Sequence, residues 1–144
     1  MNKIFLLILL FLCIGANAFA QKDKKKEKRI EHKVVIQLST PDTAAYRALT
    51  RQLNNLKTAW EEAEVVVVAH NKGINMLQKA TCSVPNEIQR LMAKGVVFIA
   101  CEYTMQQLKL SKGEMLENIA YTPYGLVEII TRQEKGYAYL KAGF

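Results

Sequence analysis

The sequence has few of the residues that metal sites and disulfide scaffolds need. Among its 144 residues are three cysteines and two histidines, and one histidine lies in a charged segment near the N-terminus. Neither residue type recurs at the spacing of zinc ligands, so we expect no metal site. The two cysteines beyond the N-terminal apolar run are too few for a disulfide scaffold, so packing must hold the core.

Signatures of several enzyme classes are also missing. The sequence has no glycine-rich phosphate loop, no G-x-S-x-G motif and no paired-carboxylate signature. The sequence therefore gives no support for catalysis by a nucleophile, a base and a residue that orients the base. The chain also has no nucleic-acid-binding motif, and its net charge beyond residue 33 is close to zero. We therefore expect no nucleic-acid partner.

The first twenty residues have the pattern of a signal peptide. Lys3 precedes the apolar run 4–15, and Ala18-Phe19-Ala20 provides a small-x-small cleavage pattern. The run is too short to span a bilayer comfortably, and no second run of about 20 apolar residues follows it. We predict a signal peptide at 1–20, cleavage near Ala20, a periplasmic or secreted protein, and no stable membrane insertion.

Residues 21–32 form a basic leader. Much of the formal charge of +7 lies in and beside the stretch QKDKKKEKRIEH, which has no apolar pattern. Such a composition is typical of a flexible, solvated segment between a cleavage site and a domain. Contact with an anionic lipid or polyanion is the alternative interpretation.

Residues 33–144 alternate between strand and helix patterns. KVVIQLS (33–39) and AEVVVVAH (63–70) indicate strands, and the four consecutive valines indicate burial on both faces, as in a parallel sheet covered by helices. An apolar stripe between them predicts a helix that ends near Trp60.

The second half continues this alternation. We predict a helix from Pro85, a strand VVFIA before Cys101, a short helix at 104–110, a brief strand ENIAY, a further helix and the final strand YAYLKAGF. In the helix after Pro123, we expect Leu126, Val127 and Ile130 to face inward. The chain is thus predicted to be a single α/β domain, with a mainly parallel sheet and helices on both faces.

Polar side chains follow the predicted strands at their carboxyl ends, where parallel sheets bind ligands. Cys101 ends one strand and precedes a helix, whose positive dipole end favours a thiolate. Lys72 or a protonated His70 would add to this effect, and Glu102 would oppose it. The remaining candidate binding residues are Asn71, Thr104, Thr122 and Tyr124.

Three stretches resemble the DsrE/DsrF-like family, in particular its small exported members: VVVVAHNKGINML, IQRLMAKGVVFIACEYTM and YTPYGLVEIITRQEKGYAYLKAGF. The resemblance implies a five-stranded parallel sheet and a homo-oligomer, often a trimer or a multiple of it. Relatives in the cytoplasm carry sulfur as a persulfide on a cysteine at the place of Cys101. This chain departs from them in its export signal and in the residues 102–104 that follow Cys101.

The leading hypothesis is an exported sulfur- or thiol-handling protein that acts as a sulfur carrier or resembles a sulfurtransferase, with Cys101 as a persulfide-accepting or redox-active thiol. It would need no metal or organic cofactor, and its partners would be a sulfur donor or acceptor protein. The alternative is a non-catalytic module that binds a small ligand or assembles into oligomers, with Cys101 as a packed residue. A third interpretation is a structural Cys82–Cys101 disulfide.

Overall fold

Five parallel strands form one sheet in the order β4-β3-β2-β1-β5. The computed structural model describes residues 31–143; the predicted signal peptide (1–20) and most of the predicted leader (21–32) lie outside them. The α/β class and the five-stranded sheet are confirmed. In chain order the elements are β1 (Lys33–Leu38), α2 (Thr43–Ala59), β2 (Glu64–Ala69), η1 (Asn71–Leu77), α3 (Pro85–Ala93), β3 (Val96–Cys101), α4 (Glu102–Gln107), η2 (Lys112–Glu114), β4 (Ala120–Thr122), α5 (Gly125–Glu134) and β5 (Ala138–Ala142).

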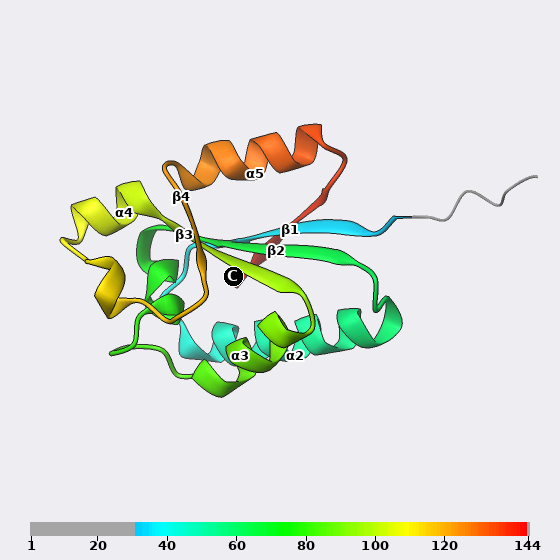
Figure 1. Ribbon diagram of the computed structural model, residues 1–144, viewed down its shortest axis with the longest axis horizontal. Helices are drawn as coiled ribbons and strands as arrows, with labels where there is room; N and C mark the ends of the chain where they lie inside the picture. Colours follow the sequence, from blue (N-terminus) through cyan, green and yellow to red (C-terminus); the bar gives the residue numbers. More distant parts are fainter. Residues whose placement is uncertain (1–30, 144) are drawn as a thin grey trace, which may run out of the picture. The chain divides into compact units, whose positions relative to one another are not determined.

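The strand order determines which face of the sheet each helix covers. The chain steps in one direction from β1 through β2 to β3, then returns from β4 across the sheet to place β5 beside β1. Because crossovers between parallel strands are right-handed, this reversal puts α2 and α3 on one face and α5 on the other. Figure 1 shows α5 alone above the sheet, with α2 and α3 below it.

The face under α2 and α3, here called the α2/α3 face, holds most of the buried side chains. Tyr46, Leu53, Leu91 and Phe98 are each at most 1% exposed there. The opposite face, here called the α5 face, has a much smaller core. Its buried residues are Val35, Val66, Val68, Ile99, Ile129 and Tyr137.

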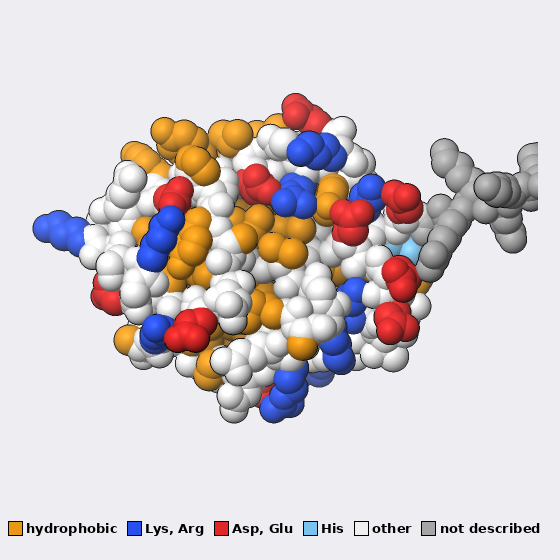
Figure 2. Space-filling model, viewed as in Figure 1, with side chains coloured by type: hydrophobic (Ala, Val, Ile, Leu, Met, Phe, Trp, Pro, Cys, Tyr) orange, Lys and Arg blue, Asp and Glu red, His pale blue; other side chains and the backbone are white. Residues whose placement is uncertain are grey.

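The expected orientation of α5 is wrong. Leu126, Val127 and Ile130 are 56%, 57% and 54% exposed, whereas Ile129 and Gly125 face the sheet. Apolar residues lie on both sides of this helix, so the sequence pattern alone did not show which side is buried. Figure 2 shows hydrophobic side chains gathered on the molecular surface over α5.

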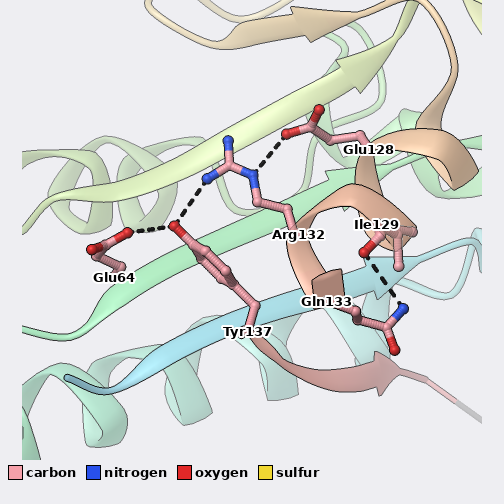
Figure 3. A network of polar contacts seen from close by, with 6 residues as sticks. All are labelled: Glu64, Glu128, Ile129, Arg132, Gln133 and Tyr137. Atoms are coloured by element: carbon pink, nitrogen blue, oxygen red, sulfur yellow. Dashed lines mark hydrogen bonds and ion pairs between the residues drawn. The ribbon is translucent and has the colours of Figure 1, made fainter. Parts of the chain in front are cut away.

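A polar network fastens the C-terminal end of α5 to the sheet (Figure 3). Arg132 Nε donates to Glu128 Oε1 at 2.8 Å, and Arg132 Nη1 donates to the Tyr137 hydroxyl at 3.1 Å. The same hydroxyl donates to Glu64 of β2. This hydrogen bond lowers the pKa of Glu64, while burial raises the pKa of Tyr137. The network adds polar contacts where the apolar core is small.

Candidate functional site

Cys101 lies where β3 ends, and its sulfur contacts the start of α5. The side chain is 4% exposed, and Sγ accepts a hydrogen bond from the Gly125 backbone N–H at 3.2 Å. Gly125 is the first residue of α5, so this N–H has no partner within its helix and carries part of the positive end of the helix dipole. The sequence pattern pointed to α4, the next helix, whereas the helix that donates to the sulfur begins 24 residues later.

Glycine fits well at position 125 because three side chains crowd it. A Cβ added there would lie 3.2 Å from His70 Cβ, 3.3 Å from Cys101 Cβ and 3.4 Å from Val68 Cγ1. Since His70 ends the neighbouring strand, the first turn of α5 sits directly over the carboxyl ends of β2 and β3. The absence of a side chain thus allows the helix N-terminus to reach the sulfur.

An open pocket of about 430 Å³ borders Cys101 at this edge of the sheet. The half-exposed rings of Tyr103 and Tyr124 lie 6.0 Å apart between centroids. Among the described residues that line the pocket there is no Lys, Arg, Asp or Glu, so a ligand would meet neutral groups. The lining residues are His70, Asn71, Cys101, Tyr103, Thr104, Gln107, Tyr124, Gly125, Leu126 and Val127.

His70 is a neutral member of this pocket wall. It is 7% exposed, and burial lowers its pKa below the ordinary value of 6.5, with a side-chain hydrogen bond to Asn71 acting in the opposite direction. Its Nε2 lies 2.8 Å from Nε2 of Gln37 in β1. At neutral pH the imidazole is therefore a hydrogen-bonding group and adds no positive charge beside Cys101.

Thr104 and Asn71 join the ends of two strands. The Thr104 hydroxyl accepts a hydrogen bond from the Asn71 backbone N–H at 3.1 Å. Asn71 has a φ of 48°, a left-handed conformation that asparagine tolerates better than most residues. This turn and the first turn of α4 thus both contribute to the lining of the pocket.

Residues 32–142 match the DsrE/DsrF-like family, which is almost the whole described part of the chain. The chain belongs to the DsrE/DsrF-like family. This membership confirms the resemblance seen in the sequence and gives the chain a fold related to sulfur relay.

Two solved structures share the DsrE-like fold. The chain is similar to MTH1491 from Methanobacterium thermoautotrophicum, a protein of unknown function, with 26% identity and a TM-score of 0.73 over 77% of this chain and 99% of that chain. It is also similar in fold to BT1422 from Bacteroides thetaiotaomicron, likewise of unknown function. There the identity is 15% and the TM-score 0.64, over 76% of this chain and 93% of that chain. No curated protein matches the sequence.

The DsrE-like fold brings together most of the candidate residues. His70, Asn71, Thr104 and Tyr124 line one pocket with Cys101. Lys72 and Thr122 are not part of that lining. Lys72 is exposed, and its backbone carbonyl accepts a hydrogen bond from the Tyr46 hydroxyl at 3.5 Å. Thr122 is buried and pairs with Cys101 in the register of β3 and β4.

The structure adds residues that the sequence patterns did not single out. Gly125 supplies the N–H to the sulfur, Tyr103 and Gln107 line the pocket, and Gln37 contacts His70. Two signals were present in the sequence. Gln37 interrupts an otherwise apolar strand, and Gly125 stands at the start of a helix, where glycine is a weak helix former.

Cys82 lies in a different environment from Cys101. It is half-buried and packs against the core of the α2/α3 face. Burial raises the pKa of its thiol, and the charge of Glu87 adds to this effect. Both cysteines of the described chain are free thiols, so the structure has no disulfide between them.

Two further observations concern the described residues as a whole. No group of three or more His, Cys, Asp or Glu side chains within residues 31–143 lies close enough to hold a metal ion. None of the helices in this part of the chain is long and apolar enough to cross a membrane.

Proposed function

We propose that this protein is an exported sulfur- or thiol-handling protein in which Cys101 accepts a sulfane sulfur. The observation that supports this most strongly is the hydrogen bond from Gly125 N–H to Cys101 Sγ, at the N-terminus of α5 and beside an open pocket. A thiolate is the nucleophilic form of cysteine, and both the N–H and the helix dipole favour it. Membership of the DsrE/DsrF-like family makes sulfur the chemistry to test first.

The proposed step is a transfer between thiols. The Cys101 thiolate attacks the outer sulfur of a persulfide donor, R–S–SH; a new S–S bond forms, and the donor S–S bond breaks with its electron pair. The donor leaves as a thiolate, which takes the proton that Cys101 released. Cys101 then carries the persulfide, and attack by an acceptor thiol reverses the sequence. The exchange has no net oxidation and requires no metal or organic cofactor.

The polarity of the pocket suits the terminal sulfur of a persulfide. Sulfane sulfur is a weak acceptor that is well matched to neutral donors, and His70, Asn71, Thr104 and Tyr124 provide polar groups along the same wall. We infer that these four side chains orient the sulfur. Lys72 and Thr122 would act only from outside the pocket.

Export would place this chemistry outside the cytoplasm. The pattern at 1–20 supports cleavage near Ala20 and a periplasmic or secreted protein. The sulfur donor or acceptor would then be a partner in that compartment. Expression of the full chain, followed by N-terminal sequencing of the exported product, tests this assignment: an intact Met1 in the extracytoplasmic fraction, or retention in the cytoplasm, would contradict it.

We further propose that the chain forms a homo-oligomer through its α5 face. Leu126, Val127 and Ile130 on the outer side of α5 are more than half exposed, and Val97 on the same face of the sheet is 42% exposed. Exposed apolar surface on one face is typical of an interaction site. A trimer or a multiple of it is the state that the family resemblance suggests.

The experiment for the sulfur function is intact-mass analysis of protein purified without reductant. Wild type, Cys82→Ser and Cys101→Ser are each measured before and after incubation with polysulfide. We expect wild type and Cys82→Ser to gain one sulfur atom that dithiothreitol removes, and Cys101→Ser to gain none. Equal loading of Cys101→Ser would rule out Cys101 as the acceptor.

The alternative function is a non-catalytic module that binds a small ligand. The low exposure of Cys101 and the aromatic, uncharged pocket favour it, because a packed cysteine and two tyrosines suit an uncharged organic molecule. Under this alternative, none of the three proteins takes up sulfur while both thiols of the wild type remain free. The mass experiment therefore separates the two functions.

A further inference from the structure

A chain of side-chain hydrogen bonds leads from the surface to His70. The Tyr139 hydroxyl, on the edge strand β5, donates to Oε1 of Gln37 in β1. The other end of the Gln37 amide, Nε2, lies 2.8 Å from Nε2 of His70. Tyr139 is exposed and His70 is buried, so the chain crosses three neighbouring strands from solvent to the pocket wall. We refer to these three side chains as the Tyr139 relay.

The Tyr139 hydroxyl can donate or accept, so the direction of each hydrogen bond follows from the orientation of the Gln37 amide. An amide oxygen only accepts and an amide nitrogen only donates. With Oε1 taken by the Tyr139 hydroxyl, Gln37 turns its NH₂ toward His70, and His70 Nε2 must then supply a lone pair. The proton of a neutral imidazole consequently sits on Nδ1. A free neutral histidine side chain favours the opposite arrangement, with the proton on Nε2, so the relay imposes the less common tautomer.

This tautomer determines what His70 offers to the pocket. The lone pair of Nε2 is occupied by Gln37, so the ring is not available there as a base. Nδ1–H is then left for the side-chain hydrogen bond with Asn71, and both residues line the pocket beside Cys101. His70 and Cys101 also lie close together, because a single added Cβ at Gly125 would be 3.2 Å from one Cβ and 3.3 Å from the other.

We propose that Gln37, held by Tyr139, is a positioning residue for the Cys101 site: it fixes His70 as the neutral Nδ1–H tautomer, which keeps a hydrogen-bond donor in the wall of the pocket beside Cys101. This inference rests on the proposed function, since the site it serves is the sulfur site. Gln37 does not line the pocket, and it acts through His70. The role explains why a polar residue occupies β1 next to the buried Val35 and Ile36.

The first test reads the tautomer directly. Two-dimensional ¹⁵N–¹H correlation spectra of the histidine ring are recorded at neutral pH for wild type, Gln37→Leu and Tyr139→Phe, with Gln52→Leu as the matched control on the exposed side of α2. We expect Nδ1–H in wild type and in the control, a shift of population toward Nε2–H in Gln37→Leu, and a smaller shift in Tyr139→Phe. Nε2–H in wild type, or one unchanged tautomer in all four proteins, would overturn the proposal.

The second test connects the relay to Cys101. In a Cys82→Ser background, the rate of Cys101 alkylation is compared with and without Gln37→Leu, with thermal melts of the same samples. We expect a rate about fivefold lower in the variant, the size of effect that one misplaced hydrogen-bond donor in the pocket wall produces. A changed tautomer with an unchanged rate would overturn the positioning role. Neither readout requires sulfur uptake, so failure of the proposed function would appear separately, as absent polysulfide loading.

Discussion

The two faces of the sheet differ in how completely the chain covers them. On the α2/α3 face two helices, η1 and the loop before α3 enclose a large apolar core. On the α5 face a single helix covers six buried residues, and its own outer side remains apolar and exposed. The Cys101 sulfur turns toward the second face, while Cys82 packs against the first. One face holds most of the buried core, and the other holds the candidate site and the surface that we propose for assembly.

The largest expected effect is a difference in stability between two substitutions on one strand, one for each face of the sheet. Phe98 and Ile99 are adjacent in β3, both nearly fully buried, and they point to the α2/α3 face and the α5 face respectively. Phe98→Ala should lower the free energy of unfolding by about 3–5 kcal/mol, because a cavity forms in a closely packed core. Ile99→Ala should cost about 2 kcal/mol, the lower end for such a change, because few side chains surround it. Urea denaturation of both variants measures the difference, and an equal or larger loss in Ile99→Ala would contradict this comparison.

The next effect concerns assembly on the α5 face. Ile130→Glu places a charge on the apolar outer side of α5, so we expect the oligomer to dissociate to monomer at micromolar concentration. Because Ile130 is 54% exposed, monomer stability should change by only about 0.5 kcal/mol. Sedimentation velocity measures the association state.

Leu108→Glu is the matched control for assembly, since Leu108 is 50% exposed and is the C-cap residue of α4 rather than part of α5. This variant should retain the wild-type oligomer. A wild type that is monomeric, or an oligomer unaffected by Ile130→Glu, would refute assembly through this face.

A smaller effect tests how α5 is held. Tyr137→Phe removes the hydroxyl that joins Arg132 to Glu64, and the loss should be about 1 kcal/mol, as for a partly buried hydrogen bond. Chemical denaturation at neutral pH gives this value. A loss within error of zero would mean that the polar network does not hold α5.

The smallest effect is a pH dependence in the same network. The Tyr137 hydroxyl lowers the pKa of Glu64 below its ordinary value of 4.5. The folded state therefore binds this proton less readily than the unfolded state, so the stabilisation is complete above pH 4.5 and is lost as the pH falls through the lowered pKa. Because Glu64 is largely exposed, the change is small. The free energies of unfolding of wild type and Tyr137→Phe, plotted against pH, should approach each other by a small amount as the pH falls below 4.5. Curves that stay parallel would count against the link.

Much of the fold could be predicted from the sequence because its signals are local. The run Val65–Val68 suits a strand buried on both faces. Asp42 caps α2 by accepting a hydrogen bond from Ala44 N–H at 2.8 Å, and Asp is one of the residues favoured at such a position. Ser111 and Glu114 form a capping box, which has the S-x-x-E spacing in the sequence. Each of these features depends on neighbours within a few residues.

The features that could not be predicted from the sequence depend on contacts between distant segments. Leu126, Val127 and Ile130 could not be oriented without knowing that α5 crosses the sheet alone. The N–H that binds the sulfur comes from Gly125, which the strand order brings above Cys101, and the polarity of Gln37 acquires a role only beside His70. Cys101 itself was identifiable because strand ends in a parallel sheet share one edge.

The most direct test of the central claim is a competition between the two thiols in one sample. Wild-type protein, fully reduced, is treated with a limiting amount of iodoacetamide at pH 7, and mass spectrometry of its peptides gives the labelling ratio. The Cys101 thiolate is favoured by Gly125 N–H and the N-terminus of α5, while burial raises the pKa of Cys82. We expect Cys101 to label faster than Cys82, and faster labelling of Cys82 would contradict the account of a reactive thiol on the α5 face.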